Sequence, residues 1–265
     1  MKERPILMSA PMVRASLSGR KTNTRRIFTI PSWSDSDYMP PLLYPGLDGY
    51  HMVAEPSRCL APVPCPYGKP GDRLWVRETW RPYSWPPHHI TVQMRADGEI
   101  VDVDVPDTVK GDHWTESICE SANLECQRAE CDFDGENYSW DGDDNCPIKW
   151  RPSIFMPRWV SRLTLEITQE RIERLQDISE QGCIAEGIES DGDGHYANYL
   201  DPADDKLVGC WMGPKPSFAS LWDSINGVGS WAANPLIRAL AFKVIHPAIE
   251  SSTPFPALAS SKRFK

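Results

Sequence analysis

The sequence predicts an α+β protein built from many short strands, two or three short helices and long irregular loops. Its 265 residues include 25 Pro and 11 Trp, which indicates an aromatic core interrupted by loops and leaves little room for long helices. Short runs in which apolar and polar residues alternate recur along the chain, as expected for half-buried strands. A chain of this length can also bury a substantial core.

The N-terminal segment predicts a strand, a helix and a basic turn. Residues 5–9 (PILMS) fit a short strand, and residues 10–18 fit an amphipathic helix. The helix should end at Gly19, because glycine readily adopts the left-handed conformation that closes a helix. Residues 19–26 (GRKTNTRR) then bring an amine, hydroxyl groups and guanidinium groups together, which suits an anionic or planar polar ligand. A solvated basic turn is the alternative, and residues 27–30 predict a second strand.

The middle of the chain predicts a strand, a bend and a hairpin. Residues 71–72 (GD) form a turn before an alternating strand over residues 74–78. Residues 80–87 contain several prolines and predict a bend. Residues 90–105 predict a β-hairpin, because alternating residues flank the favoured turn sequence Asp97-Gly98.

The last hundred residues predict two strands and two short helices. Residues 160–172 alternate clearly and predict a strand. Ser179 can cap a helix that runs to Ala185 and leaves through Glu186 and Gly187. A further helix is expected over residues 217–225, and a last strand over residues 236–245.

The domain prediction is one unit over residues 1–246 that carries three insertions. These insertions are polar, rich in turn residues and weakly periodic, and they lie at about 31–69, 108–149 and 190–214. Residues 247–265 lack pattern and are expected to be a disordered tail.

Charge is distributed unevenly along the chain. The net charge of −9 argues against indiscriminate binding to a polyanion. Residues 1–30 nevertheless carry seven cationic residues against Glu3 alone, whereas residues 97–144 carry sixteen acidic residues against Lys110 and Arg128. One end of the molecule is therefore suited to phosphate and the other repels it. The sequence contains no apolar run long enough to span a membrane and no secretory signal, so we expect a cytoplasmic protein.

The basic segment also resembles the motif of a known family. Gly19-x-Lys21-x-x-Thr24-x-Arg26 resembles the ASCH domain, a small β-barrel related to the PUA folds that bind RNA. Residues 70–76 (PGDRLWV), residues 175–189 (LQDISEQGCIAEGIE), Trp222 and the last strand follow in the order of the same family. The longer chain, with residues 77–80 (RETW) and residues 156–159 (MPRW), is similar to proteins of phages and prophages. The resemblance implies a PUA-like mixed β-barrel, closed or nearly closed, that carries the insertions and acts in a bacterial cell.

The resemblance implies catalytic roles for Lys21, Thr24 and Glu186. Small bacterial amidohydrolases of the ASCH-like group remove the acetyl group from cytidine acetylated on its exocyclic amine, and their working residues match these three positions. A Thr hydroxyl needs a neighbouring base to become a nucleophile, and a desolvated Lys with a lowered pKa can be that base. A carboxyl group can then protonate the leaving amine or hold the Lys in place. The alternative is an ordinary Lys21–Glu186 ion pair beneath a ligand groove.

Further residues suit the recognition of a nucleobase or a phosphate. Aromatic faces stack on bases, and Arg and Glu side chains read base edges or bind phosphate, although Trp is also a common core residue. The candidates are Arg25, Arg26, Glu78, Trp80, Arg158 and Trp159.

The favoured function is therefore an amidohydrolase that acts on an N-acylated, cytidine-type nucleoside and requires no cofactor. One alternative is a non-catalytic module that binds a modified base or a short single-stranded RNA or DNA segment. A second alternative is a phage accessory protein that binds a host factor through its acidic insertion.

Eight cysteines without a secretory signal favour reduced thiols or a metal over disulfides. A structural zinc is a candidate, since four thiolates in the second insertion suit tetrahedral coordination. Those four are Cys119, Cys126, Cys131 and Cys146. The chain lacks a C-x-x-C pair, however, and this favours unligated cysteines.

Overall fold

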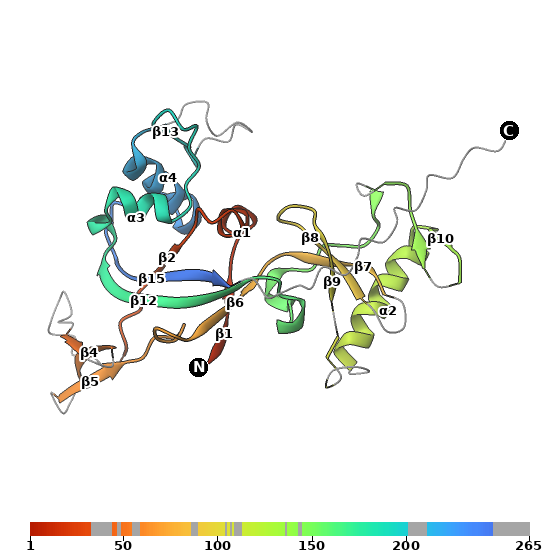
Figure 1. Cartoon of the computed structure of the whole chain (residues 1–265), viewed down its shortest axis with the longest axis horizontal. Coiled ribbons are helices and arrows are strands. Elements are labelled where there is room, and N and C mark those ends of the chain that lie inside the picture. The colour runs from red at the N-terminus through yellow and green to blue at the C-terminus, as the bar shows by residue number, and fades with distance from the viewer. Residues whose placement is uncertain are drawn as a thin grey trace.

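The computed structural model describes residues 1–32, 44–46, 49–54, 59–85, 90–103, 105–106, 108, 113–135, 137–142, 145–200 and 211–245. Two lobes lie side by side along the long axis of the molecule (Figure 1). The first lobe contains β1 (Glu3–Leu7), α1 (Ala10–Leu17), β2 (Asn23–Ile27), β3 (Tyr44–Gly46), β4 (Gly49–Ala54), β5 (Cys59–Val63), β6 (Arg73–Arg77), β12 (Thr164–Arg174), α3 (Glu180–Ala185), β13 (His195–Tyr196), β14 (Trp211–Met212), α4 (Pro214–Asn226) and β15 (Leu236–Ile245). The second lobe contains β7 (Trp80–Ser84), β8 (Ile90–Met94), β9 (Ile100–Val103), α2 (His113–Arg128), β10 (Asp132–Phe133) and β11 (Tyr138–Ser139). Short 3₁₀ turns lie at Ser153–Phe155, Arg158–Val160 and Leu175–Asp177.

The first lobe is organised around a five-stranded sheet. Its strand order is β1-β6-β12-β15-β2, with β1 and β6 parallel and the other neighbours antiparallel. β12 and β15 form the longest pair, from Thr164 opposite Ile245 to Arg174 opposite Leu236, with a register shift between Ile167 and Gln169. The predicted α+β class is confirmed.

The predicted barrel closure is not formed by the described strands. β1 and β2 are the two edges of the five-stranded sheet, and no hydrogen-bonded pairing joins them. The residues between these strands form α1, whose Val13 is fully buried in a core with Ile6, Leu74, Leu165 and Leu240. A helix packed on one face of an open sheet buries that face without strand-to-strand closure.

The ends of α1 and α3 follow the sequence prediction. Gly19 has φ of +73° directly after α1, the left-handed geometry expected there. The Ser179 hydroxyl caps α3 by accepting a hydrogen bond from the Gly182 amide at 3.1 Å. β1, α1, α3, α4 and β15 all lie where the sequence predicts an element of that type.

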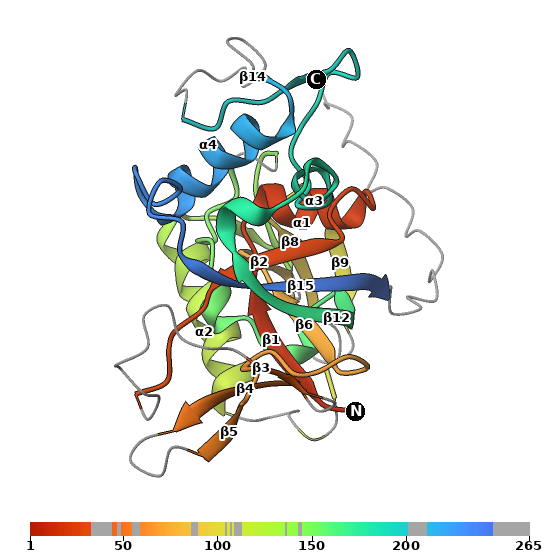
Figure 2. The same cartoon turned by 90° about the vertical axis from the view of Figure 1, so that its left-hand side faces the viewer.

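Helices α3 and α4 cover one end of the long β12–β15 pair. Ile237 and Ala239 of β15 pack against Cys183 of α3 and against Phe218 and Trp222 of α4. Figure 2 shows both helices on one side of the β12–β15 pair, with β4 and β5 on the opposite side. This packing places the exit of α3 beside the exit of α1.

The second lobe has a three-stranded sheet of order β7-β8-β9 and a long helix. The predicted hairpin is confirmed as β8 and β9, and Val92 and Met94 pack with Trp80, Met156 and Val160 in its core. The Arg14 guanidinium of α1 donates a 2.6 Å hydrogen bond to the Ala96 carbonyl in the hairpin turn, so the hairpin tip contacts the first lobe.

Helix α2 was not expected from the sequence. It has 16 residues, and its buried positions include Ala122 and Cys126, with Ile118 partly buried beside them. These three residues lie four positions apart on one face of the helix, but two of them are small, so the apolar stripe gives a weak signal among the surrounding acidic residues.

Other predicted loops also contain secondary structure. The predicted bend at residues 80–87 contains β7, an edge strand in which Pro82 lies at a register shift, a position where the lack of an amide is tolerated. The insertion at 31–69 contains β3, β4 and β5, and the insertion at 190–214 contains β13 and β14. The predicted strand at 27–30 lies earlier, at Asn23–Ile27.

The predicted tail at 247–265 lies outside the described residues, and the single-domain boundary at 246 stays a prediction. In the part of the chain that the structure describes, no helix combines the length and the apolarity needed to cross a membrane.

Candidate functional site

The segments that follow the C-terminal ends of α1 and α3 are in close contact, and the site is built on this contact. The Lys21 amide donates to the Ala15 carbonyl at 2.9 Å, and the Thr22 amide donates to the Ala185 carbonyl at 2.9 Å. Gly187 has φ of +85°, and a Cβ atom added there would lie 2.8 Å from the Ala15 Cβ and 2.9 Å from the Lys21 Cβ. Only glycine therefore fits at position 187. Because it has no side chain, the two segments can approach closely, and Glu186 lies next to Lys21.

Lys21 and Glu186 form a buried ion pair at this contact. The Lys21 Nζ lies 2.8 Å from Glu186 Oε2 and donates a second hydrogen bond to the Glu186 carbonyl at 2.9 Å. Lys21 is 0% exposed. Burial lowers the pKa of Lys21 from its ordinary value of 10.5, and the negative charge of Glu186 opposes this shift. The Lys21 amine is therefore easier to deprotonate than a solvated lysine.

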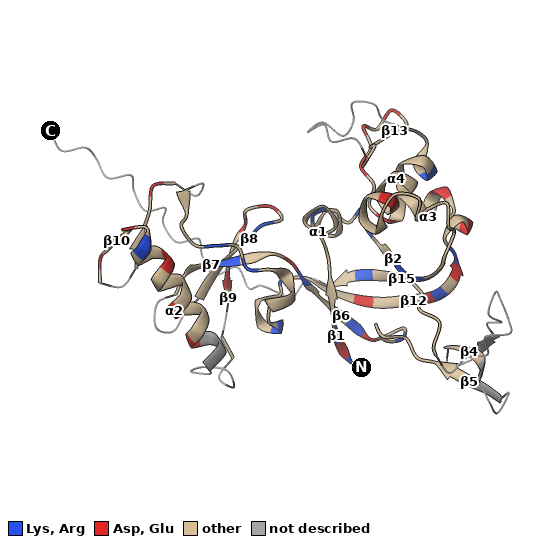
Figure 3. Cartoon of the chain, turned by 180° about the vertical axis from the view of Figure 1, so that it is seen from behind, with Lys and Arg blue, Asp and Glu red and all other residues tan. Residues whose placement is uncertain are grey.

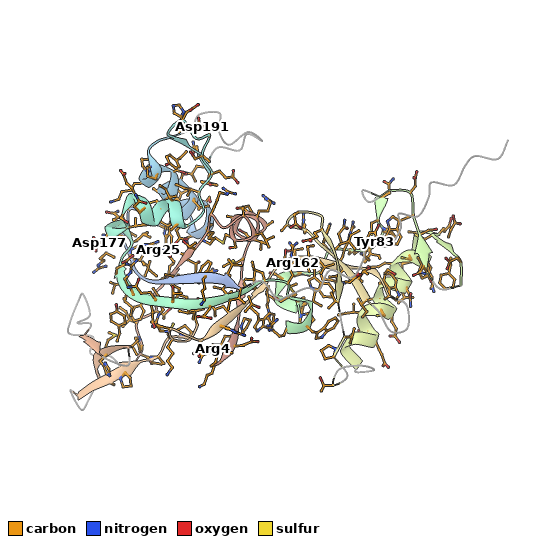
Figure 4. All side chains as sticks on the ribbon, in the orientation of Figure 1. Arg4, Arg25, Tyr83, Arg162, Asp177 and Asp191 are labelled. Carbon is orange, nitrogen blue, oxygen red and sulfur yellow. The ribbon has the colours of Figure 1, made fainter. Side chains whose placement is uncertain are left out.

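Arg25 joins the same cluster from strand β2. Its Nη1 donates to Glu186 Oε1 at 3.0 Å, and its Nη2 donates to Glu173 Oε1 of β12 at 3.0 Å. Figure 4 shows Arg25 between α3 and the β12–β15 pair. We call Lys21, Arg25, Glu173 and Glu186 the site cluster. Each Glu186 oxygen thus accepts a hydrogen bond from a different cation, which fixes the orientation of this carboxylate.

A cavity of about 210 Å³ lies against the site cluster. Its polar wall is formed by Thr24, Arg25, Arg26 and Glu186. The remaining lining residues are mostly apolar or aromatic: Met12, Ile27, Tyr67, Phe218, Leu221, Trp222, Ile225 and Asn226. A mostly apolar concave wall with a few convergent polar groups is the usual form of a small-molecule site.

The cavity has a buried end and an exposed end. Thr24, Arg25 and Glu186 are buried, whereas Ile27 and Ile225 are each 52% exposed. The part of the cavity wall formed by Thr24 is therefore shielded from water. Such shielding strengthens electrostatic interactions with the buried charges.

The structure brings together some of the predicted site residues and separates the others. Lys21 contacts Glu186, and Thr24, Arg25, Arg26 and Glu186 line one cavity. Glu78 lies at the junction of the lobes, where it pairs with Arg162, and Trp80 is part of the second-lobe core.

Arg158 and Trp159 also lie away from this cavity. Arg158 is exposed and pairs with Glu3 at 2.9 Å, and Trp159 packs against the second-lobe core. The ligand-binding roles of Glu78, Trp80, Arg158 and Trp159 stay predictions.

The four candidate zinc ligands are divided between two clusters. Cys126, Cys131 and Cys146 belong to one apolar cluster beneath α2, whereas Cys119 packs against the second-lobe core. Burial raises the pKa of the Cys126 thiol to about 12, and the neighbouring Cys131 and Cys146 add to this effect. Among the described residues, no group of three or more metal-binding side chains has a geometry that could hold an ion. The zinc site stays a prediction.

The sequence did not predict most of the apolar residues that line the cavity. Phe218, Leu221, Trp222 and Ile225 lie at positions i, i+3, i+4 and i+7 of α4, so the helical period of 3.6 residues could have identified this face. It also missed Glu173, because a charged residue in a long alternating strand gives no local sign that it pairs with Arg25.

Comparison of the chain with protein-family models, with curated proteins and with solved structures found no match.

Proposed function

We propose that the cavity beside the site cluster binds an N-acylated, cytidine-type nucleoside and that Lys21, Thr24 and Glu186 hydrolyse its exocyclic amide. The observation that carries the proposal is the contact between a fully buried Lys21 amine and Glu186, which lines a cavity together with Thr24. A buried amine with a lowered pKa is the form of lysine that can act as a base.

The proposed reaction forms an acyl ester on Thr24 and then hydrolyses this ester. Neutral Lys21 accepts the Thr24 hydroxyl proton as Thr24 Oγ1 attacks the acyl carbon, so a C–O bond forms and the carbonyl π electrons move to oxygen. Collapse of this intermediate breaks the C–N bond, and a proton held between Lys21 and Glu186 passes to the leaving amine. Water then attacks the Thr24 ester and gives a proton to neutral Lys21, the acyl C–O bond to Thr24 breaks, and Lys21 returns the proton to Thr24 Oγ1 as a carboxylic acid is released. An activated water could replace Thr24 as nucleophile with the same proton balance.

The walls of the cavity support a planar ligand. Trp222, Phe218 and Tyr67 provide aromatic surface, and aromatic side chains are effective partners for nucleobases. We further infer that the five-stranded sheet with α1 and α3 is an ASCH-type, PUA-like unit. The order of the sequence motifs supports this inference, and so does the position of Lys21, Thr24 and Glu186 at one place in the fold.

The proposal is tested by incubating the purified protein with N4-acetylcytidine and following the release of free cytidine by chromatography. The wild-type protein should release cytidine, and Glu186→Gln should lose most of this turnover because the amide can neither hold the Lys21 proton nor transfer it. Equal turnover by the two proteins would show that Glu186 has no catalytic role. If the wild-type protein releases no cytidine, the proposed hydrolase activity is wrong.

A non-catalytic binding module is the second candidate, and one observation favours it. Both oxygens of Glu186 are already satisfied by Lys21 and Arg25, as in a structural ion pair that supports a groove. In that case cytidine and its acylated form should bind without conversion. Isothermal calorimetry of cytidine binding, beside the turnover assay, separates the two functions.

A further inference from the structure

The charges around the cavity do not cancel. Within the site cluster, Lys21 and Arg25 are balanced by Glu186 and Glu173, with which they form ion pairs of 2.8 to 3.0 Å. Arg26 adds one further positive charge to the cavity wall. Among the described residues, no carboxylate forms a salt bridge with Arg26, so the wall retains a positive charge in the absence of a ligand.

Arg26 also keeps hydrogen-bond donors available. Its Nη2 donates to the Leu7 carbonyl at 2.7 Å, which anchors the guanidinium against strand β1. Its Nε is buried and has no hydrogen-bond partner among the described residues. A guanidinium has five N–H donors in a fixed planar fork, and one bond to a neutral carbonyl leaves most of them for a ligand.

The position of Arg26 indicates which part of a ligand it would meet. Arg26 is half-buried, whereas its neighbours in the chain are buried on one side (Thr24 and Arg25) and exposed on the other (Ile27). A planar base that places its exocyclic amide near Thr24 would have its sugar and any 5′ substituent toward the open end. Figure 3 shows the wider contrast, with acidic residues along α2 in the second lobe and basic residues on β2 and β15 in the first.

We propose that Arg26 binds the 5′-phosphate of the ligand, so that the preferred substrate is the acylated cytidine monophosphate and not the free nucleoside. This inference rests on the proposed function, because it takes the same cavity and the same base. An Arg–phosphate pair is a charge-assisted contact, stronger than the hydrogen bonds available to a neutral ribose hydroxyl. The net charge of −9 on the chain disfavours a long polyanion, so the phosphate is expected to belong to a mononucleotide.

The test compares two substrates and four proteins. Hydrolysis of N4-acetylcytidine and of N4-acetylcytidine 5′-monophosphate is measured for wild type, Arg26→Gln, Arg26→Lys and Arg20→Gln. Arg20 is the matched control, since it is an exposed arginine of the same basic segment and does not line the cavity. Calorimetric binding of cytidine and cytidine 5′-monophosphate to the same proteins provides a second readout that requires no turnover.

Wild type should prefer the monophosphate by about tenfold or more in kcat/KM, as expected for one hydrogen-bonded charge pair. Arg26→Gln should abolish this preference, Arg26→Lys should retain part of it, and Arg20→Gln should leave it unchanged. Added salt should reduce the wild-type preference, because the contact lies toward the open end of the cavity.

The outcomes separate this inference from the proposed function. Turnover of both substrates with equal kcat/KM overturns the phosphate role and leaves the hydrolase intact. Tighter binding of the monophosphate that depends on Arg26, without turnover, supports the phosphate role and overturns the hydrolase. A preference that survives Arg26→Gln, or stronger binding of a cytidine-containing trinucleotide than of the mononucleotide, also overturns the inference. If no nucleoside or nucleotide binds, both proposals are wrong.

Discussion

Two buried ion-pair clusters of this protein use similar contacts and differ in what they can do. The site cluster joins Lys21 and Arg25 to Glu173 and Glu186 in the first lobe. A second cluster, the junction cluster, surrounds Arg162 where the two lobes meet (Figure 4). Arg162 binds both oxygens of Glu78 at 2.9 Å and also contacts Asp97 and Glu99 of the hairpin turn.

The clusters differ in the cation and in access. The site cluster contains a lysine whose pKa is lowered by burial, and two of its other members, Arg25 and Glu186, line a cavity of about 210 Å³. The junction cluster is built on an arginine, which keeps its proton, and it borders neither of the two cavities of about 210 Å³ in the described structure. A buried ion pair can therefore transfer protons to a ligand only where one partner titrates and a cavity admits the ligand. The junction cluster is expected to hold the two lobes together.

The largest expected effect is on catalysis at the site cluster. Lys21→Met should lower kcat/KM for the acylated substrate by about 10²- to 10⁴-fold, the usual contribution of a positioned base. Arg162→Lys keeps the positive charge of the junction cluster and should retain activity near that of the wild type. Steady-state kinetics on the folded variants measures the contrast, and equal losses in both would mean that the two clusters act alike.

The next effect is on stability at the junction cluster. Arg162→Met leaves the buried Glu78 without its cation and should reduce the free energy of unfolding by about 3 to 5 kcal/mol. Glu99→Gln removes a carboxylate that is exposed to solvent and should change the free energy of unfolding far less. Urea unfolding followed by tryptophan fluorescence measures both. A small change for Arg162→Met would show that the junction does not depend on this pair.

The pH dependence of activity should follow Lys21. The base must be neutral, and burial lowers the pKa of Lys21 below 10.5, so kcat/KM should rise with pH and level off below that value. The rising limb should be absent from the residual activity of Lys21→Met. A wild-type rate that falls as pH increases through this range would assign the critical proton to a different group.

The features that the sequence predicted correctly are mostly local ones. Local signals predicted the helix end at Gly19, the Ser179 cap and the Asp97–Gly98 hairpin, because each depends on residues that are close in sequence. Strand β2 was predicted too late because its residues, NTRRI, lack apolar alternation. Four of these residues, at positions 24–27, line the cavity.

Long-range pairing could not be predicted from local signals. The resemblance to ASCH domains suggested that Lys21 and Glu186 would meet, and they do so across 165 positions of sequence. Nothing suggested the junction cluster, in which Arg162 meets Glu78 from 84 positions away. Both contacts join residues far apart in sequence, so composition and periodicity carry no information about them.

The smallest expected effect concerns the thiol cluster beneath α2, a third buried group that is separate from both ion-pair clusters. Burial raises the pKa of Cys126 to about 12, so in the metal-free protein its thiol should stay protonated at neutral pH. Treatment with a chelator should leave the melting temperature and the activity unchanged. Stoichiometric zinc in the purified protein, lost together with stability on chelation, would contradict this expectation and support the zinc site.

The most direct test of the central claim is the hydrolysis of N4-acetylcytidine by Thr24→Val beside Thr22→Val. Both substitutions remove one hydroxyl from the same segment, but Thr24 is buried on the cavity wall, whereas Thr22 is exposed and does not line it. We predict that Thr22→Val releases cytidine at nearly the wild-type rate and that Thr24→Val loses about 10² or more in kcat. Equal rates for the two variants, or no cytidine from any of the three proteins, would contradict the account.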